Sequence, residues 1–308
     1  MTTLFYSHPA CQEHDPGPHH PESPARLRAV ESALVRPEFA GLERREPPLG
    51  DLATVERVHP ADFVDRILGA IPPHGHAAID ADTVVSEGSR EAALRAIGAL
   101  TGAVDAVAKG EAKNAFCAVR PPGHHAEPAR AMGFCLFNNV AVGALHARAA
   151  HGMERVAVVD FDVHHGNGTQ AMFEADKDLF FASTHQYPLY PGTGAASETG
   201  VGNIVNCPLP PNAGGPEFRA AMEARVLPEL KRFAPEMIFI SAGFDAHRDD
   251  PLAMLNFVED DYAWATMQKM AVAEEYAGGR VVSTLEGGYN LQALANSAAA
   301  HVRALMGL

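Results

Sequence analysis

The chain has 308 residues, of which 47% are hydrophobic and 20% are charged. These proportions lie close to globular averages and exclude an intrinsically disordered chain. The formal net charge is −14, and no run of basic residues offsets it, so we expect no nucleic-acid partner. No apolar run reaches the roughly 18 residues that a membrane-spanning helix needs, so we expect no membrane partner either.

Cysteine usage and the first residues bear on the cellular compartment. The four cysteines are far apart and form no C-x-x-C motif: Cys11, Cys117, Cys135 and Cys207. This pattern favours buried free thiols in a reducing compartment. The segment Met1–Pro9 lacks the charged start and apolar stretch of a signal peptide. We therefore expect a cytoplasmic protein, and the sequence leaves a homo-oligomer open.

Short β-rich runs alternate with alanine-rich helical stretches along the chain. The predicted strands are Thr3–Tyr6, Ala115–Val119, Val156–Phe161, Leu179–Ser183, Met237–Ala242 and Val281–Leu285. The predicted helices are Pro24–Val35, Ser89–Lys109, Asn138–His151, Pro216–Phe233, Asp260–Tyr276 and Asn290–Met306. This alternation predicts an α/β fold with a mostly parallel sheet and helices on both faces. Without a repeat or a long linker, we expect a single domain over residues 1–308.

The densest polar motifs follow predicted strands. They are Arg120–His125, Asp160–His165, Ser183–His185, Ser241–Asp245 and Glu286–Tyr289. In open parallel sheets, ligands bind beyond the carboxyl ends of the strands. Five polar motifs in that position predict one active site at the carboxyl edge of the sheet.

Asp160, Asp162 and His164 are spaced by two residues, which places their side chains on one side of an extended chain. Asp245 follows another predicted strand. Asp162, His164 and Asp245 would form a three-ligand site, the number that leaves a position open on a catalytic zinc ion. Such an ion can act as a Lewis acid on a carbonyl. The alternative is that the aspartates cap the following helix.

His124 and His125 are candidate bases, because neutral imidazole accepts protons near pH 7. Asp160 and Asn167 could each fix the tautomer of one ring. Tyr289, after two glycines, is a candidate hydrogen-bond donor to an oxyanion. The structural alternatives are histidines exposed in a turn, a turn asparagine and a core tyrosine.

Two aromatic residues lie in loops between the motifs. As a facing pair, Phe134 and Tyr190 would form a narrow apolar tunnel for a lysine-like methylene stem. The alternative is that both are ordinary hydrophobic anchors. A serine hydrolase is disfavoured because the chain lacks a G-x-S-x-G motif.

Six motifs, in order along the chain, resemble those of the zinc-dependent histone deacetylase superfamily. They are RPPGHHA (120–126), MGFCLFNN (132–139), DFDVHHGNGT (160–169), YPGTG (190–194), SAGFDAH (241–247) and EGGYN (286–290). An H-P-x-x-P-x-R pattern at residues 20–26 also fits. The superfamily includes bacterial histone deacetylase-like amidohydrolases, acetoin-utilisation proteins and acetylpolyamine amidohydrolases. The resemblance extends from His20 to Tyr289.

The resemblance implies an arginase-like fold around a mostly parallel, eight-stranded sheet. It implies zinc on Asp162, His164 and Asp245, with Tyr289 polarising the scissile carbonyl. The catalytic His pair would be His124 and His125, oriented by Asp160 and Asn167. It further implies a substrate-binding carbonyl on Gly133, a tunnel wall at Phe134 and an inner-channel arginine at Arg26. Finally, it implies a structural K⁺ held by the backbone oxygens of Asp160, Asp162, His164 and Thr184 and by the side chain of Ser183.

Departures from the family patterns indicate the subclass. Asn167 stands where class I enzymes have aspartate, which makes the chain similar to class II enzymes and their bacterial relatives. Tyr289 is not the histidine of the weakly active class IIa enzymes. Leu252 stands where the polyamine-selective eukaryotic enzyme has a glutamate.

The resemblance therefore implies zinc-dependent hydrolysis of N-acetyl amides, with a metal-bound water as nucleophile and an acetyl-lysine-like substrate. Acetylpolyamines or other small acyl amides are the first alternative. A non-catalytic module that binds acyl ligands is the second. The sequence leaves open whether Zn²⁺ or Fe²⁺ is the metal used in the cell.

Overall fold

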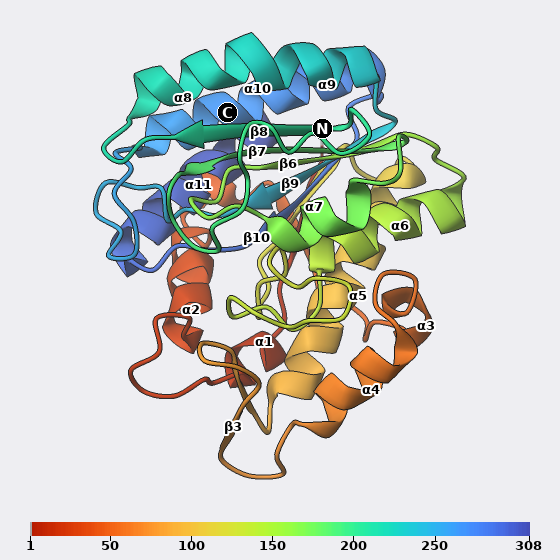
Figure 1. Cartoon of the computed structure of the whole chain (residues 1–308), viewed down its shortest axis with the longest axis vertical. Coiled ribbons are helices and arrows are strands. Elements are labelled where there is room, and N and C mark those ends of the chain that lie inside the picture. The colour runs from red at the N-terminus through yellow and green to blue at the C-terminus, as the bar shows by residue number, and fades with distance from the viewer. Residues whose placement is uncertain (1) are drawn as a thin grey trace.

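The computed structural model describes residues 2–308. Its centre is an eight-stranded sheet in the order β2-β1-β5-β10-β9-β6-β7-β8, and all neighbouring strands are parallel (Figure 1). The strands are β1 (Thr3–Tyr6), β2 (Leu42–Arg45), β5 (Asn114–Cys117), β6 (Val156–Asp160), β7 (Leu179–Gln186), β8 (Ile204–Leu209), β9 (Met237–Ala242) and β10 (Val281–Leu285). The predicted parallel sheet is confirmed.

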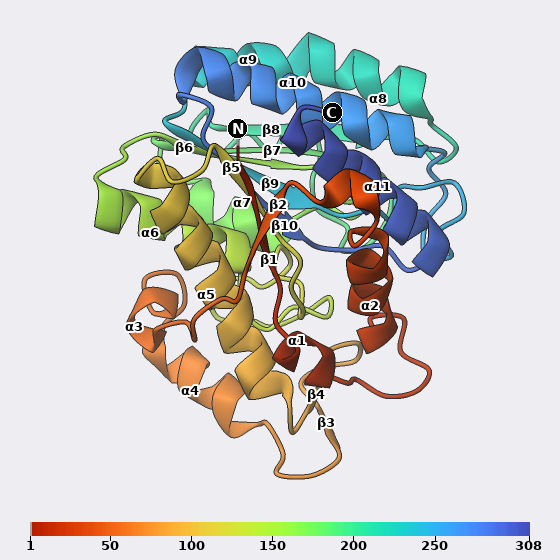
Figure 2. The ribbon, with the colours of Figure 1, turned by 180° about the vertical axis from the view of Figure 1, so that it is seen from behind.

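Helices cover both faces of the sheet (Figures 1 and 2). One face carries α8 (Gly215–Ala221), α9 (Leu227–Phe233), α10 (Glu259–Tyr276) and α11 (Leu291–Met306), with α2 (Pro24–Ala33) packed on α11. The other carries α5 (Ser89–Ala108), α6 (Asn139–His151) and α7 (Asn167–Phe173). Outside these layers lie α1 (Ala10–Glu13), α3 (Leu52–Val55), α4 (Ala61–Gly69) and the small antiparallel pair β3 (His76–Ala78) and β4 (Val84–Ser86).

The central strands are apolar along nearly their whole length because both of their faces are covered. Every residue of β6 and β9 is buried, as expected for strands between two helical layers. Among residues 2–308, no helix is long and apolar enough to cross a lipid bilayer.

The sequence patterns missed both edge strands. β2 has the sequence LERR, with one apolar residue, and β8 contains Asn206 and Pro208. Charged residues and proline are typical of edge strands, where they discourage pairing with another chain. The patterns also missed the short elements α1, α3, α4, α7, β3 and β4. None of them is longer than nine residues, which is too short for a clear periodicity.

The topology brings the polar motifs to one edge of the sheet. Parallel strands β5, β6, β9 and β10 each lead directly into a motif at their carboxyl ends. β7 extends beyond the predicted end at Ser183, to Gln186, so Ser183–His185 belong to the strand itself. The fold therefore brings the motifs together, as predicted.

Candidate active site

Asp162, His164 and Asp245 form a buried cluster beyond β6 and β9. These strands are neighbours, with Asp160 opposite Ser241 in the register. His164 Nδ1 lies 3.1 Å from Asp162 Oδ1 and 3.1 Å from Asp245 Oδ2. One ligand atom of each side chain lies within 4.8 Å of the other two. The structure thus brings together the three residues that the sequence predicts as metal ligands.

The chemistry of this cluster fits a divalent metal ion. Burial, and then the charge of Asp162, raises the pKa of Asp245 to about 7, because two carboxylates face each other away from water. A divalent cation would supply the missing positive charge. Gly287 leaves room beside the two carboxylates, since a Cβ at this position would lie 2.1 Å from Asp245 Oδ2. One nitrogen and two oxygen donors suit zinc or a similar ion.

Each histidine of the pair is held by one partner. His124 Nδ1 lies 2.8 Å from Asp160 Oδ2, and His125 Nδ1 lies 2.8 Å from Asn167 Oδ1. The Asn167 amide nitrogen donates to Glu127 Oε1 at 2.8 Å, which orients the amide oxygen toward His125. His125 therefore donates through Nδ1, and its Nε2 is left without a proton. The sequence did not indicate Glu127.

The two rings differ in their affinity for a proton. Burial opposes charge on His124, but Asp160 and Asp162 outweigh it and raise its pKa to about 10. Burial, and then the positive charges of His124 and His164, hold the pKa of His125 well below its usual value. A divalent cation beside Asp162 would offset part of its charge and lower the His124 pKa. Burial keeps His125 neutral, and the bond of its Nδ1 to Asn167 leaves Nε2 as the nitrogen that can accept a proton.

Glu286 anchors the turn that carries the His pair. Its Oε2 accepts hydrogen bonds from the backbone N–H groups of Gly123 at 2.7 Å and His124 at 3.2 Å. Its Oε1 accepts from Ser241 Oγ at 3.1 Å. Burial raises the pKa of Glu286 to about 7. Glu286 is the first residue of the EGGYN motif, and no role was predicted for it from the sequence.

Tyr289 lies in the loop after β10, and Asp250 fixes that loop. Asp250 Oδ2 accepts from the Tyr289 N–H at 2.7 Å, and its Oδ1 accepts from the Leu252 N–H at 3.0 Å. Burial, and then the nearby carboxylates Asp245 and Asp162, raise the pKa of the Tyr289 hydroxyl well above its usual value, although Arg26 opposes them. The hydroxyl therefore keeps its proton and can donate.

Arg26 stabilises the same loop through hydrogen bonds to its backbone. It is fully buried and donates to the carbonyl oxygens of Gly288 and Glu286, both at 2.5 Å. The Glu22 carboxylate accepts hydrogen bonds from Arg26 at 2.9 Å and from Arg120 at 2.7 Å. Burial opposes ionisation of Glu22, but Arg120 and Arg26 outweigh it and hold its pKa well below the usual range. That Arg26 lines an inner channel remains a prediction.

A cavity of about 200 Å³ leads to the cluster. It is lined by Asp82, His125, Gly133, Phe134, His164, Leu189, Tyr190, Leu252 and Tyr289. The Phe134 and Tyr289 rings lie 5.9 Å apart at 80°, and Tyr190 meets His125 edge to face at 5.2 Å. The substrate-binding residues predicted from the sequence thus all line one cavity.

Asp82 is the one lining residue with a carboxylate, and the sequence did not indicate it. It lies in the connection between β3 and β4 and belongs to no motif. Its Oδ1 accepts from the Gly133 N–H at 3.1 Å and from Thr83 Oγ1 at 2.9 Å. Asp82 therefore adds a carboxyl group to a cavity that is otherwise lined by aromatic and apolar residues.

Gly133 contacts His125 so closely that a side chain would not fit. Its φ is +58°, and a Cβ would lie 2.5 Å from His125 Cδ2. We expect Gly133→Ala to displace the ring and lower kcat at least about tenfold, because small misplacements of a catalytic group are costly. The metal content should not change. Both are measured on purified protein.

Gly75→Ala is the matched control for this variant. Gly75 has a φ of +74°, and nothing lies within 4 Å of the position of its Cβ. The control therefore shares the backbone strain without the clash. Equal kcat for the two variants would show that Gly133 does not act through His125.

The residues of the predicted potassium site lie on two adjacent strands and in the loop after one of them. Asp160 ends β6, Asp162 and His164 follow it, and Ser183 and Thr184 belong to β7. Ser183 pairs with Asp160 in the register of β6 and β7, and Ser183 Oγ lies 2.9 Å from His185 Nδ1. Thr184 Oγ1 is buried and has no hydrogen-bond partner among residues 2–308. The potassium site itself remains a prediction.

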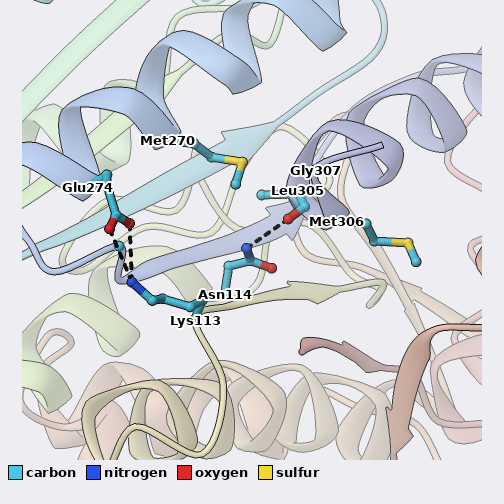
Figure 3. A pocket seen from close by; sticks show the side chains of 8 residues that line it. Lys113, Asn114, Met270, Glu274, Leu305, Met306 and Gly307 are labelled. Carbon is cyan, nitrogen blue, oxygen red and sulfur yellow. Dashed lines mark hydrogen bonds and ion pairs between the residues drawn. The ribbon is translucent and has the colours of Figure 1, made fainter. Parts of the chain in front are cut away.

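Another cavity, of about 250 Å³, lies near the amino ends of β5 and β10, opposite the carboxyl ends that carry the motifs. Figure 3 shows the side chains that line it. Its lining includes Lys113, which pairs with Glu274 at 3.1 Å, and Asn114, which donates to the Leu305 carbonyl at 2.9 Å. These residues lie where β5 and β10 begin, away from the motif loops. None of its lining residues belongs to the metal-ligand cluster, so it is not the candidate active site.

Comparisons with known proteins agree with the geometry. A family model described as histone deacetylase domain matches residues 20–305. A histone deacetylase-like amidohydrolase from Pseudomonas aeruginosa is 40% identical over 94% of this chain and 82% of that protein. The chloroplastic histone deacetylase 14 of Arabidopsis thaliana is 40% identical over 99% of this chain and 77% of that protein.

A solved structure extends the comparison to the fold. The crystal structure of the HDA15 HD domain superposes with a TM-score of 0.95 at 36% identity, covering 99% of this chain and 88% of that chain. The fold is therefore the deacetylase fold, and the relatives support deacetylase or amidohydrolase activity. The chain belongs to the histone deacetylase family.

Proposed function

We propose that the protein is a zinc-dependent hydrolase of N-acetyl amides, with acetyl-lysine-like compounds as its substrates. The observation that carries the proposal is the buried cluster of Asp162, His164 and Asp245 beside the neutral ring of His125. Tyr289 lines the same cavity with a protonated hydroxyl. A ligand set, a base and an oxyanion donor therefore surround one space.

His125 and Tyr289 have different tasks in the proposed reaction. The metal, when bound, supplies Lewis-acid activation of the acyl carbonyl. His125 Nε2 accepts a proton from the attacking water, and the Tyr289 hydroxyl donates a hydrogen bond to the oxyanion. The resulting His125 imidazolium returns the proton to the leaving nitrogen as the C–N bond breaks. After the acid formed gives its proton to the amine, the products are an ammonium group and acetate.

The remaining predicted residues have roles in binding and support. Phe134 and Tyr190 would enclose the methylene stem, and the Gly133 carbonyl would accept a hydrogen bond from the substrate amide. Arg26 holds the loop of Tyr289 through its carbonyl oxygens. We also propose a structural K⁺ beside Ser183 and Thr184, for which the resemblance is the support.

Charge at the cavity decides between acetyl-lysine and acetylpolyamine substrates. Leu252 cannot pair with a second ammonium group, and an ammonium group buried against it without a partner is costly. Asp82, the one carboxylate of the cavity, already accepts hydrogen bonds from Gly133 and Thr83. We expect the wild type to prefer an acetyl-lysine peptide to acetylspermidine in kcat/KM, and Leu252→Glu to shift the preference toward acetylspermidine. Both are measured with the same substrate panel.

Leu252→Gln is the control for the change in polarity without charge. Asp82→Asn tests the other carboxylate of the cavity, since Asp82 could pair with an ammonium group. A wild type that already favours acetylspermidine would contradict the substrate assignment, and loss of that preference in Asp82→Asn would identify the reason.

The experiment that tests the function is turnover of an acetyl-lysine peptide, followed by acetate release, before and after chelation. We expect turnover that chelation abolishes and added Zn²⁺ restores. Binding of the peptide without acetate release would instead support a non-catalytic module for acyl ligands. Release of acetate from small acyl amides alone would support the alternative amidohydrolase.

A further inference from the structure

Asp105, His146 and His151 form a second cluster of potential metal ligands, on helices α5 and α6. The two helices pack side by side in both views (Figures 1 and 2). Their carboxyl ends lead into the starts of β5 and β6. The cluster therefore lies toward the amino edge of the sheet, away from the active site at the carboxyl edge.

The three side chains converge on one point. Asp105 Oδ1 lies 2.8 Å from His146 Nε2 and 2.6 Å from His151 Nε2. The three ligand atoms all lie within 4.8 Å of one another. The histidine side chains are 15% and 16% exposed and that of Asp105 is 40% exposed. Both rings are thus largely enclosed, while solvent reaches the carboxylate.

This spacing requires little movement to bind a metal. Zn–N and Zn–O bonds of about 2.0–2.2 Å place tetrahedral ligands about 3.3 Å apart, so each nitrogen would withdraw from Asp105 by about 0.5–0.7 Å. Solvent access beside the carboxylate leaves room for a water as fourth ligand. His146 Nε2 carries the proton that Asp105 accepts, and a metal at Nε2 requires that proton on Nδ1 instead. His146 Nδ1 is buried without a partner among residues 2–308, so the change of tautomer breaks no other hydrogen bond.

Electrostatics also favour a cation at this place. The carboxyl ends of helices carry partial negative charge, and His151 is the last residue of α6. Burial opposes ionisation of Asp105, but hydrogen bonds from His151 and His146 outweigh it and lower its pKa. The ammonium of Lys109 opposes a cation, but its side chain is exposed and free to turn into solvent.

We propose that Asp105, His146 and His151 form a second site, separate from the catalytic cluster, for a transition-metal ion such as Zn²⁺. Two imidazoles and one carboxylate select zinc, cobalt or nickel over Mg²⁺ and Ca²⁺, which prefer oxygen ligands. The bound ion ties the ends of α5 and α6 together. Because an ion that binds only the folded chain stabilises it, its effect is on stability rather than on catalysis.

Metal content after dialysis against Zn²⁺ tests the proposal on the full chain. We expect two zinc ions per wild-type chain and one in the double variant His146→Asn/His151→Asn, which should keep its turnover. Zinc should also raise the melting temperature of the wild type more than that of the double variant. His74→Asn removes an exposed histidine elsewhere and is the matched control.

Two further variants keep the test decisive. Asp105→Asn preserves size and polarity, and should also lose one ion if the double variant does not fold. Asp162→Asn should lose the catalytic ion and keep the second, so the two sites are counted separately from activity. One zinc per wild-type chain, or a second zinc that survives in both Asp105→Asn and the double variant, would overturn the proposal.

Discussion

Asp162→Asn is expected to remove the catalytic metal ion and to lower kcat/KM by on the order of 10³-fold or more. Metal activation of a carbonyl contributes several kcal/mol to catalysis, and each 1.36 kcal/mol corresponds to a factor of ten. The substitution keeps the shape of the side chain but removes one of two charges that face His164. Metal analysis and initial rates on the same preparation measure both effects.

Asp249→Asn is the control, because it removes an exposed carboxylate near the same loops without touching the cluster. It should retain the metal and the rate. Normal turnover and normal metal content in Asp162→Asn would remove Asp162 from the site.

Tyr289→Phe is expected to lower kcat by about 10²–10³-fold, the usual effect of deleting one donor to an oxyanion. The phenyl ring keeps the contacts with Arg26, whose Cζ lies 4.9 Å from the ring centroid, and with Phe134. The variant therefore isolates the hydroxyl. Steady-state kinetics and metal analysis should show a lower kcat with unchanged metal content.

Tyr276→Phe, at an exposed tyrosine that ends α10, controls for the loss of any hydroxyl. It should leave the rate unchanged. If Tyr289→Phe also turns over at the wild-type rate, the hydroxyl does not reach the reacting carbonyl and the tyrosine acts only as a packing residue.

The positions of the proposed ligands and of the His pair could be predicted because these residues follow strongly apolar strands. Runs such as those of β6 and β9 identify buried parallel strands, and the carboxyl ends of such strands meet at one edge. Asp162 and Asp245 are 83 positions apart in the sequence, and the pairing of β6 with β9 brings them together. That these residues meet follows from the parallel arrangement of the strands, without any knowledge of side-chain contacts.

Residues outside the motifs that orient the site or line its cavity could not be predicted in the same way. Glu127 orients Asn167, Asp250 fixes the loop of Tyr289, and Asp82 lines the cavity from a short hairpin. Their roles depend on tertiary contacts and not on local spacing. The cluster of Asp105, His146 and His151 was missed for the same reason, since its residues come from two helices.

The most direct test of the central claim is a titration of metal-free protein with Zn²⁺ while acetate release from an acetyl-lysine peptide is followed. We predict no release without metal and a rate that rises until the site of Asp162, His164 and Asp245 is filled. Asp162→Asn should stay inactive throughout the titration. Full activity of the metal-free wild type, or equal rates for the two proteins at saturating Zn²⁺, would contradict the account.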